Sequence, residues 1–459
     1  MIAMSLKQLA AVFAVEQDSL AQTDFCGITI DSRKRCDNQL FVAIRGERFD
    51  GHDYVEAAYQ AGAVAALVET KLDCAIPQLV VADCKQAMIQ LANHWRHQCK
   101  ATVIALTGSN GKTTVKEMLF QLLQKEGQTH ATQGNFNNDI GVPLTLFGLS
   151  IDDVYAVIEM GANHEGEIAT LARIAEPDIV YVNNVAASHL AGFGTVQGVI
   201  NAKGELYAYC QKNHSAVFNA DEVASQQWRN KCAAEKQLCC SLDSNQAADL
   251  NANWQPDETG LSLTVSYKGQ TESVSLCVLG EHNARNALAA ISIAVAAGVD
   301  FDSAVNNLSG FSGVKGRLQI LDGPNNSRLI NDSYNANPGS LEAGIKVLCS
   351  LKGDAWLALG DMGELGDEAE ALHQQAAATA LELGVEKMFA IGPLSCLACK
   401  VFAESGYCFD SIDKMALIIQ AQIHENVNLL IKGSRSAGME KLVEALLNQH
   451  TPEKVHHAS

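Results

Sequence analysis

A glycine-rich segment, ALTGSNGKTT at residues 105–114, carries the residue types best suited to bind phosphate. Gly108 and Gly111 allow the backbone to curl so that several N–H groups point at phosphate oxygens, and a helix starting there adds its partial positive charge. Lys112 would supply a cation between the β and γ phosphates, and the Thr113 hydroxyl would ligate Mg²⁺. The loop departs from the common G-x-x-x-x-G-K-[ST] form, since leucine replaces its first glycine, and an ordinary glycine turn is the alternative. We expect a nucleoside triphosphate site.

Two further groups that could serve such a nucleotide follow apolar strands. A phosphoryl-transfer site needs an acid to hold magnesium, often at the end of a neighbouring apolar strand. Glu159 lies at the end of YAVIEM, residues 155–160, and His189 follows DIVYVNNV, residues 178–185. A solvated loop glutamate and a structural histidine are the alternatives, so neither residue carries the case alone.

An alternation of strands and helices is expected to position these groups. VIAL at 103–106 predicts a buried strand, and 155–160 and 178–185 predict further strands. This alternation is typical of a parallel sheet with helical crossovers. After the glycine turn, one apolar helix face is predicted from Val115, Met118, Leu119, Leu122 and Leu123.

The same alternation restarts near residue 317. RLIND precedes a helix after Pro338, WLALG precedes a helix from Glu368, and KMFAIG and NLLIKG continue the pattern. We predict a second doubly wound unit, in which strand ends line a ligand crevice. The residues at those ends are Asp332, Asp361 and Lys432.

Length and composition restrict the class of protein. The chain has 459 residues, and at about 150 residues per domain this predicts roughly three domains. Apolar residues make up 47% and the formal net charge is −19, which argues against a nucleic-acid binder, because phosphate affinity rests on clustered Lys and Arg. No run of about 18 apolar residues occurs, so we expect no membrane insertion.

The 14 cysteines are scattered along the chain, which favours reduced thiols over a disulfide framework. Cys396 and Cys399 have the spacing of half a metal site, but no second pair follows at a suitable spacing. Incidental cysteines are the better interpretation. We expect a cytoplasmic protein.

Ordered segments along nearly the whole chain resemble the Mur ligase family, the ATP-dependent amide-forming enzymes of bacterial peptidoglycan synthesis. They are TGSNGKTT, GNFNNDIGVPLTL, IEMGANHEGEI, NNVAASHLAGFG, AKGELY, GEHNARNALAA, GVKGRLQ, NDSYNANPGS, LGDMGELG and IKGSRSAGMEK. The resemblance implies an α/β protein of three domains. These are a small N-terminal α/β domain that binds the UDP-sugar (1–99), a central P-loop parallel-sheet domain of ATPase type (100–316), and a C-terminal Rossmann-like domain that binds the incoming dipeptide (317–459).

Within the family, GNFNNDIGVPLTL, IEMGANHEGEI, SYNANPGS and LGDMGELG resemble the branch that joins D-alanyl-D-alanine to UDP-N-acetylmuramoyl-tripeptide. The D-N-P-R signature typical of the relative that adds a diamino acid is missing from the sequence. The resemblance implies that ATP converts a carboxylate to an acyl phosphate, which an amine then attacks with loss of phosphate. The alternatives are a ligase that adds a single amino acid and a nucleotide-dependent regulator. A monomer is expected.

The resemblance assigns the catalytic and nucleotide-binding residues. Catalysis is expected from Lys112, Glu159, His189 and Lys203, and two Mg²⁺ ions are expected on Thr113, Glu159, His189 and a carbamoylated Lys203, whose oxygens would suit hard Mg²⁺. From the sequence alone, Lys203 would be a solvated lysine, Asn283 a helix cap beside an exposed Asn286, and Arg317 a hinge charge. Nucleotide contacts are assigned to Gly108, Ser109, Asn110, Gly111, Lys112, Thr113, Thr114, Asn283, Asn286, Arg317 and Asp332.

The resemblance also assigns substrate contacts. Uridine or diphosphate would meet Ser32, Arg33, Gly46 and His52, for which surface turns are the alternative. Asn135, Asn137 and Asn138 would orient the muramoyl peptide. The C-terminal domain would contribute Tyr334, Asn335, Asn337, Asp361, Glu364 and Ser434, several of which could instead hold loops together. Because Arg317 would reach the nucleotide from another domain, we predict domain closure as a catalytic step.

Overall fold

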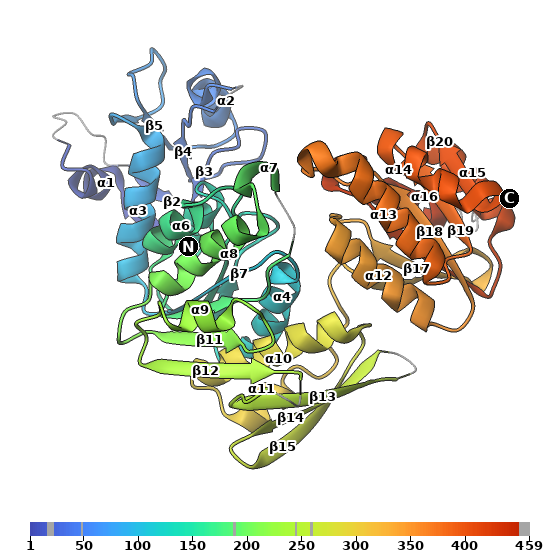
Figure 1. Cartoon of the computed structure of the whole chain (residues 1–459). Helices are drawn as coiled ribbons and strands as arrows, with labels where there is room; N and C mark the ends of the chain where they lie inside the picture. Colours follow the sequence, from blue (N-terminus) through green and yellow to red (C-terminus); the bar gives the residue numbers. More distant parts are fainter. Residues whose placement is uncertain (16–22, 47–48, 187–189, 244–245, 258–259, 449–459) are drawn as a thin grey trace, which may run out of the picture.

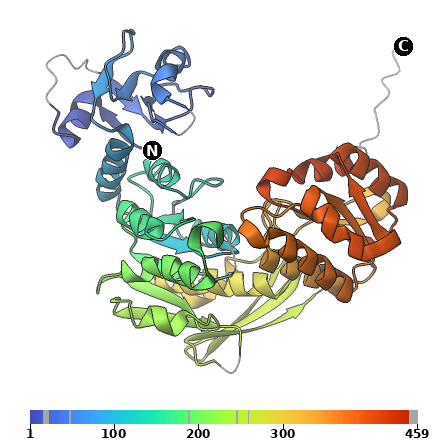
Figure 2. The ribbon, with the colours of Figure 1, turned by 45° about the horizontal axis from the view of Figure 1, so that its top comes forward.

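The computed structural model forms three lobes that follow one another along the chain (Figure 1). It describes residues 1–459 except 16–22, 47–48, 187–189, 244–245, 258–259 and 449–459. Figure 2 shows the N-terminal and C-terminal lobes as separate bodies, each attached to the central lobe. No helix in the described part of the chain is both long and apolar enough to cross a membrane.

The N-terminal lobe contains a short parallel sheet in the order β3-β4-β5-β6, and β1 pairs with β2 in an antiparallel ribbon. Alternate residues of β4 face two different apolar cores, because Leu40 and Val42 pack on one side of the sheet and Phe41 on the other. The elements are β1 (Ala3–Ser5), α1 (Leu6–Val12), β2 (Asp24–Cys26), β3 (Ile28–Thr29), β4 (Leu40–Val42), α2 (Val55–Gln60), β5 (Ala65–Val68), β6 (Gln78–Val80) and α3 (Cys84–Gln98).

The central lobe is built on one sheet in the order β15-β14-β13-β12-β11-β10-β7-β9-β8. The strands from β8 to β13 are parallel, and β14 and β15 extend the sheet as an antiparallel meander. The strands are β7 (Thr102–Thr107), β8 (Thr129–Ala131), β9 (Tyr155–Glu159), β10 (Ile179–Val182), β11 (Ser215–Asn219), β12 (Lys236–Ser241), β13 (Leu250–Pro256), β14 (Leu261–Tyr267) and β15 (Gln270–Leu276).

Helices cover both faces of the central sheet. Val103 and Ala105 of β7 pack with α6 and α8, whereas Ile104 and Leu106 pack with α4 and α10. The apolar helix face predicted between residues 115 and 123 is confirmed, since its five members are all fully buried in α4. The helices are α4 (Lys112–Leu123), α5 (Gly141–Phe147), α6 (Glu167–Ala175), α7 (Leu190–Phe193), α8 (Val196–Ala208), α9 (Ser225–Arg229), α10 (Glu281–Ala296) and α11 (Phe301–Asn306).

The C-terminal lobe is a second doubly wound unit with the strand order β16-β17-β21-β18-β19-β20, parallel except for β16. Helices α12 to α14 contribute to one apolar cluster, and α15 and α16 to another. The elements are β16 (Gln319–Asp322), β17 (Arg328–Asp332), α12 (Pro338–Ser350), β18 (Asp354–Gly360), α13 (Ala369–Glu382), β19 (Lys387–Ile391), α14 (Pro393–Ala398), β20 (Gly406–Phe409), α15 (Ile412–Gln422), β21 (Val427–Lys432) and α16 (Glu440–Asn448).

The expectation of reduced thiols throughout is wrong at one position, because Cys396 of α14 and Cys408 of β20 form a disulfide. The pairing was hidden in the sequence because the two cysteines meet only when β20 lies beside β19. Cys399, the other member of the C-x-x-C segment, is free and buried.

Candidate functional site

A cavity of about 820 Å³ lies between the central and C-terminal lobes. The glycine-rich loop, the turn before α6 and the first turn of α10 form its central wall, and the segments after β17 and β21 form its C-terminal wall. Predicted site residues among those lining it are Ser109, Asn110, Gly111, Lys112, Thr114, Asn135, Asn137, Asn138, Glu159, Asn283, Asn286, Arg317, Asp332, Tyr334, Asn335 and Asn337.

The glycine-rich loop joins the end of β7 to the start of α4. Gly111 precedes the first helical residue and has φ of 78°, a left-handed value that favours glycine. The ammonium of Lys112 donates to the carbonyl oxygens of Gly108, at 2.6 Å, and Ser109, at 3.3 Å. Burial lowers the pKa of Lys112, while the nearby carboxylate of Glu159 opposes this change. The loop thus holds a cation at the amino end of a buried helix, the arrangement that phosphate binding needs.

Glu159 ends β9 directly beside this loop and is buried, so the solvated alternative is wrong. The Thr113 hydroxyl donates to its Oε2 at 2.9 Å, and the Asn137 amide donates to its Oε1 at 2.9 Å. Arg317 of the C-terminal lobe donates through Nη2 to the Thr113 oxygen at 2.9 Å. The site therefore places a carboxylate and a hydroxyl in contact, which are hard oxygen donors of the kind that Mg²⁺ prefers.

Lys203 lies within α8 and is only 1% exposed, so it is not a solvated lysine. Burial, helped by the positive charge of Lys112, lowers its pKa to about 7, although nearby carboxylates oppose this change. An amine with this pKa has a substantial unprotonated fraction near neutral pH. His189, which was predicted to act with Lys203, lies outside the described residues.

Two carboxylates that sequence reasoning missed hold the turn before α6. Glu205, from the same helix as Lys203, accepts the N–H groups of Gly166 at 2.6 Å and Ala169 at 2.9 Å. Glu167 accepts the N–H of Asn163 at 2.7 Å. Both acids lie inside the segments AKGELY and IEMGANHEGEI, but their hydrogen bonds to backbone N–H groups become visible only in the structure.

Asn283 and Asn286 face inward from the first two turns of α10 and are 5% and 4% exposed. Asn283 does not cap the helix, because Gly280 occupies that place and the Asn283 amide donates to the Leu279 carbonyl at 2.9 Å. Asn286 donates to the side-chain oxygen of Asn283 at 3.1 Å. The alternative of a helix cap beside an exposed amide is therefore wrong, and both side chains belong to a buried polar network at the cavity.

The C-terminal wall brings cations toward the loop. The Arg317 guanidinium stacks on the Tyr334 ring, 4.3 Å from its centroid, and its Nε is buried with no hydrogen-bond partner in the structure described. The Lys432 ammonium pairs with the Asp332 carboxylate and donates to the Asn335 carbonyl at 2.9 Å. Asn337 reaches across to Asn110, donating to its side-chain oxygen at 2.9 Å. An anionic ligand would satisfy the unpaired Arg317 donor.

Three predicted dipeptide residues do not line this cavity as the structure describes it. The Asp361 carboxylate accepts the Ser395 N–H at 2.7 Å, which caps the start of α14. Ser434 donates to the Asp361 carbonyl at 2.6 Å, and Glu364 follows in the turn after β18. Asp361 and Ser434 thus hold the loops at the ends of β18 and β21 together.

The predicted uridine residues lie in the N-terminal lobe, away from this cavity. The Arg33 guanidinium forms a bidentate pair with Asp31 at 2.8 and 3.0 Å on the surface beside Ser32. His52 is buried, accepts the Glu69 N–H at 2.8 Å, and contacts Asp50 through Nδ1 at 2.6 Å. Gly46 donates its N–H to the carbonyl of Phe49 at 2.9 Å. The geometry therefore does not join these residues to the glycine-rich loop.

Known protein families match consecutive parts of the chain. Family models described as "Mur ligase family, catalytic domain", "Mur ligase middle domain" and "Mur ligase, glutamate ligase domain" match residues 24–107, 106–294 and 316–435. The chain is similar to proteins named UDP-N-acetylmuramoyl-tripeptide--D-alanyl-D-alanine ligase. The Escherichia coli protein is 39% identical, covering 98% of this chain and 100% of the relative, and the Bacillus subtilis protein is 32% identical, covering 97% and 99%.

Solved structures are similar over the same length. A crystal structure of MurF from Acinetobacter baumannii has a TM-score of 0.90 at 33% identity, covering 98% of this chain and 99% of the other. MurF ligase from Thermotoga maritima in complex with ADP shares the fold, with a TM-score of 0.78 at 23% identity, covering 94% and 98%. The chain belongs to the Mur ligase family.

Proposed function

We propose that this protein is an ATP-dependent ligase that joins D-alanyl-D-alanine to UDP-N-acetylmuramoyl-tripeptide and so forms the pentapeptide precursor of peptidoglycan. One observation carries the proposal: a buried acid and an arginine from a second lobe both bind the Thr113 hydroxyl of the glycine-rich loop, beside a cavity that the acid, the arginine and the loop line. The full-length similarity to ligases of that name supports the choice of substrates.

The reaction must turn a poor electrophile into a good one. A carboxylate oxygen of the tripeptide attacks the γ-phosphorus of ATP, which forms an acyl phosphate and releases ADP. The dipeptide amine then attacks the acyl carbon, and phosphate leaves through a tetrahedral intermediate. Negative charge gathers on the transferring oxygens, and we propose that Lys112 and Arg317, which both line the cavity, stabilise it.

Magnesium fits the donor set beside the loop. No group of three or more His, Cys, Asp or Glu gathers among the described residues, but Mg²⁺ commonly uses one or two protein oxygens together with phosphate and water. We assign one ion to Thr113 and Glu159. It would neutralise charge on the phosphates, while Asn137 keeps the carboxylate oriented through its 2.9 Å hydrogen bond.

We further propose that Lys203 is carbamoylated and holds a second Mg²⁺ with His189. The unprotonated amine adds to the carbon of CO₂ and loses a proton, which leaves a carbamate anion with two oxygens. The lowered pKa of Lys203 supports this chemistry, because only the neutral amine is a nucleophile.

The remaining assignments follow the division into lobes. We propose that residues 1–99 bind the UDP-sugar, including through Ser32, Arg33, Gly46 and His52, and that residues 100–316 bind ATP. Residues 317–459 would bind the dipeptide. The enzyme is proposed to act as a monomer in the cytoplasm, where ATP is available. Contacts with the muramoyl peptide are proposed for Asn135, Asn137 and Asn138, and with the dipeptide side for Tyr334, Asn335, Asn337, Asp361, Glu364 and Ser434.

A coupled assay of ADP release tests the proposal. The purified protein is given ATP, Mg²⁺ and UDP-N-acetylmuramoyl-tripeptide with either meso-diaminopimelate or lysine as third residue, and then a panel of dipeptides and single amino acids. We expect ADP release to require both tripeptide and D-alanyl-D-alanine, with pentapeptide as the product. Release that depends on a single amino acid would identify another ligase of the family, and nucleotide binding without dipeptide-dependent release would indicate a regulator.

A further inference from the structure

Asn183 follows β10, and all of its backbone and side-chain polar groups form hydrogen bonds within the protein. It is 3% exposed, and its backbone N–H donates to the Thr107 carbonyl at 2.9 Å. We infer that Asn183 is a positioning residue that fixes the glycine-rich loop and α10 in one arrangement and thereby sets the affinity for nucleotide. The inference rests on the proposed function only in taking a nucleotide as the ligand of the loop.

The side-chain amide of Asn183 joins the loop to α10. Its nitrogen donates to the carbonyl of Asn110 at 2.9 Å and to the side-chain oxygen of Asn286 at 2.9 Å. Its oxygen accepts the Tyr181 hydroxyl at 3.1 Å. The neighbouring Asn184 completes the grip on Asn110, accepting its N–H at 2.8 Å and donating to its carbonyl at 3.1 Å. The peptide group of Asn110 is therefore held on both sides.

These contacts allow only one orientation of the Asn183 amide. A flipped amide would turn its oxygen toward the acceptor oxygens of Asn110 and Asn286 and its nitrogen toward the Tyr181 hydroxyl. The orientation is passed on, because Asn286 then donates to Asn283, which donates to the Leu279 carbonyl. One buried side chain thus determines which way the amides of α10 face the cavity.

Steric packing reinforces the hydrogen bonds. A Cβ built on Gly111 would lie 2.5 Å from the Asn183 nitrogen and 2.5 Å from the Asn286 oxygen, and a Cβ on Gly108 would lie 3.0 Å from the Asn183 Cβ. The loop glycines therefore fit against the Asn183 side chain with no room to spare. Changing Asn183 alters the surface on which the phosphate-binding backbone rests.

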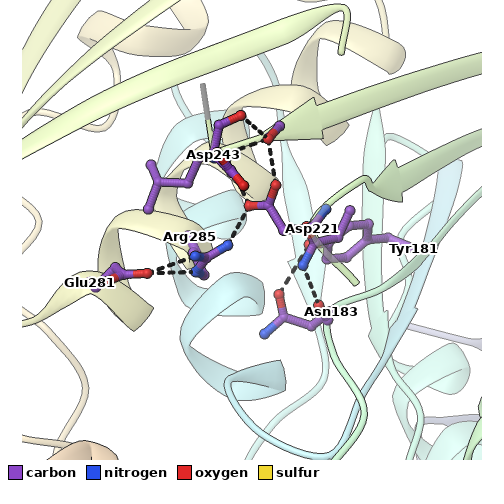
Figure 3. Close-up of polar contacts among 9 residues, drawn as sticks. Tyr181, Asn183, Asp221, Asp243, Glu281 and Arg285 are labelled. Carbon is purple, nitrogen blue, oxygen red and sulfur yellow. Dashed lines mark hydrogen bonds and ion pairs between the residues drawn. The ribbon is translucent and has the colours of Figure 1, made fainter. Parts of the chain in front are cut away.

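A second anchor of α10 provides the matched control. Arg285 pairs with Asp221 from the turn after β11 and with Glu281 on its own helix, and Asp221 also accepts from Ser241 and from the Leu242 N–H (Figure 3). In the described part of the chain, the Asp221 carboxylate makes no hydrogen bond to the glycine-rich loop. A change at Asp221 therefore loosens α10 without releasing Asn110.

Binding of Mg·ADP, measured by isothermal titration calorimetry, tests the inference without needing turnover. We expect Asn183→Ala and Asn183→Asp to weaken Mg·ADP binding roughly tenfold, the effect of losing two buried donors. Tyr181→Phe keeps both donors and Asp221→Asn keeps the loop contacts, so both should bind within about twofold of the unchanged protein. In turnover, the Asn183 variants should raise KM for ATP while leaving KM for the UDP-linked tripeptide unchanged.

Asn183→Asp offers a readout that a purely structural role would not move. Two acceptor oxygens and burial raise the pKa of the introduced carboxyl, and its protonated form regains one O–H donor. We expect its Mg·ADP affinity to recover toward that of the unchanged protein as pH falls, whereas Asn183→Ala shows no such recovery.

The experiment distinguishes failure of the proposed function from failure of the inference about Asn183. Failure of the unchanged protein to bind Mg·ADP would overturn the proposed function itself. Equal weakening by Asp221→Asn and Asn183→Ala, or a loss of thermal stability in the Asn183 variants with normal Mg·ADP affinity, would overturn the role of Asn183 while leaving the proposed function standing.

Discussion

Two buried lysines, Lys112 and Lys203, both lie near the carboxylate of Glu159 but differ in their contacts. The Lys112 ammonium donates hydrogen bonds to two carbonyls of its own loop, whereas the Lys203 amine lies over the Phe193 ring, 5.7 Å from its centroid. Burial lowers the pKa of both, to about 7 for Lys203. An amine with a pKa this low can add to CO₂ when it is unprotonated, which is the chemistry proposed for Lys203.

The pKa of Lys203 predicts a pH-dependent modification. Below about pH 7 the amine is protonated and cannot attack CO₂, and above that value it is neutral. At a fixed concentration of dissolved CO₂, the carbamate signal in ¹³C NMR should therefore grow as pH rises through 7. Lys203→Ala should lack the signal and most activity, and short carboxylic acids should restore part of the activity. A fully active Lys203→Ala protein would refute the assignment.

The carboxylate of Glu159 is expected to be needed for magnesium use. Glu159→Gln preserves the shape of the side chain and can still accept a hydrogen bond from Thr113. It removes the negative charge that would balance Mg²⁺. We expect kcat to fall on the order of 10²-fold and the magnesium concentration for half-maximal rate to rise. The rate of ADP release across a magnesium titration measures both. Asp152→Asn, an exposed acid of the same lobe, serves as the control, and equal titration curves for the two variants would contradict the assignment.

At the scale of elements, the turn from β7 into α4 depends on glycine for two separate reasons. Gly111→Ala would meet both a left-handed φ of 78° and two polar atoms at 2.5 Å. Gly269→Ala would meet a similar φ of 83° with nothing within 4 Å, so it isolates the conformational cost, about 1–2 kcal/mol. We expect Gly111→Ala to lower the free energy of unfolding more than Gly269→Ala and to abolish Mg·ADP binding.

Urea unfolding and calorimetry on the same two variants give the comparison. The steric argument fails if both glycine variants lose equal stability and both still bind Mg·ADP.

Local patterns predicted most of the elements that carry chemistry. The strand expected at 103–106 is β7, and the helix expected after Pro338 begins at Pro338 with Asn337 as its cap. These elements were predictable because apolar periodicity and capping act over a few residues. The meander of β14 and β15 at the edge of the central sheet was not predicted, although Leu261, Leu263 and Val265 alternate with polar residues as in a half-buried strand.

Contacts between residues far apart in the sequence could not be predicted from local sequence patterns. Asn183 and Asn286 meet only because β10 ends beside the start of α10, and Asp361 turned out to cap α14. The sequence named Glu159, Lys112 and Arg317 as candidates, but their meeting at Thr113 depends on how two lobes pack.

At the scale of the whole molecule, Arg317 is one of the side chains that join the C-terminal lobe to the glycine-rich loop. It donates to Thr113 while its guanidinium stacks on Tyr334, and an ammonium cannot make both contacts. We expect Arg317→Lys to lower kcat/KM for ATP roughly tenfold or more and to leave the radius of gyration larger in the presence of Mg·ADP. Steady-state kinetics and small-angle X-ray scattering provide the two measurements.

Arg328→Lys, an exposed arginine at the start of β17, is the matched control and should change neither quantity. Unaltered kinetics in the Arg317→Lys protein would remove Arg317 from the closure step.

The net charge of −19 opposes ligands that are themselves anionic, so local cations must outweigh the overall field. Arg317, Lys432 and Arg435 come from one lobe and Lys112 from the other, and all four line the same cavity. A small molecule that touched both walls would bind only while the lobes face each other. Such a compound would occupy the cavity assigned to the nucleotide, so its inhibition should be competitive with ATP, and it should also hold the two lobes together in the absence of ATP.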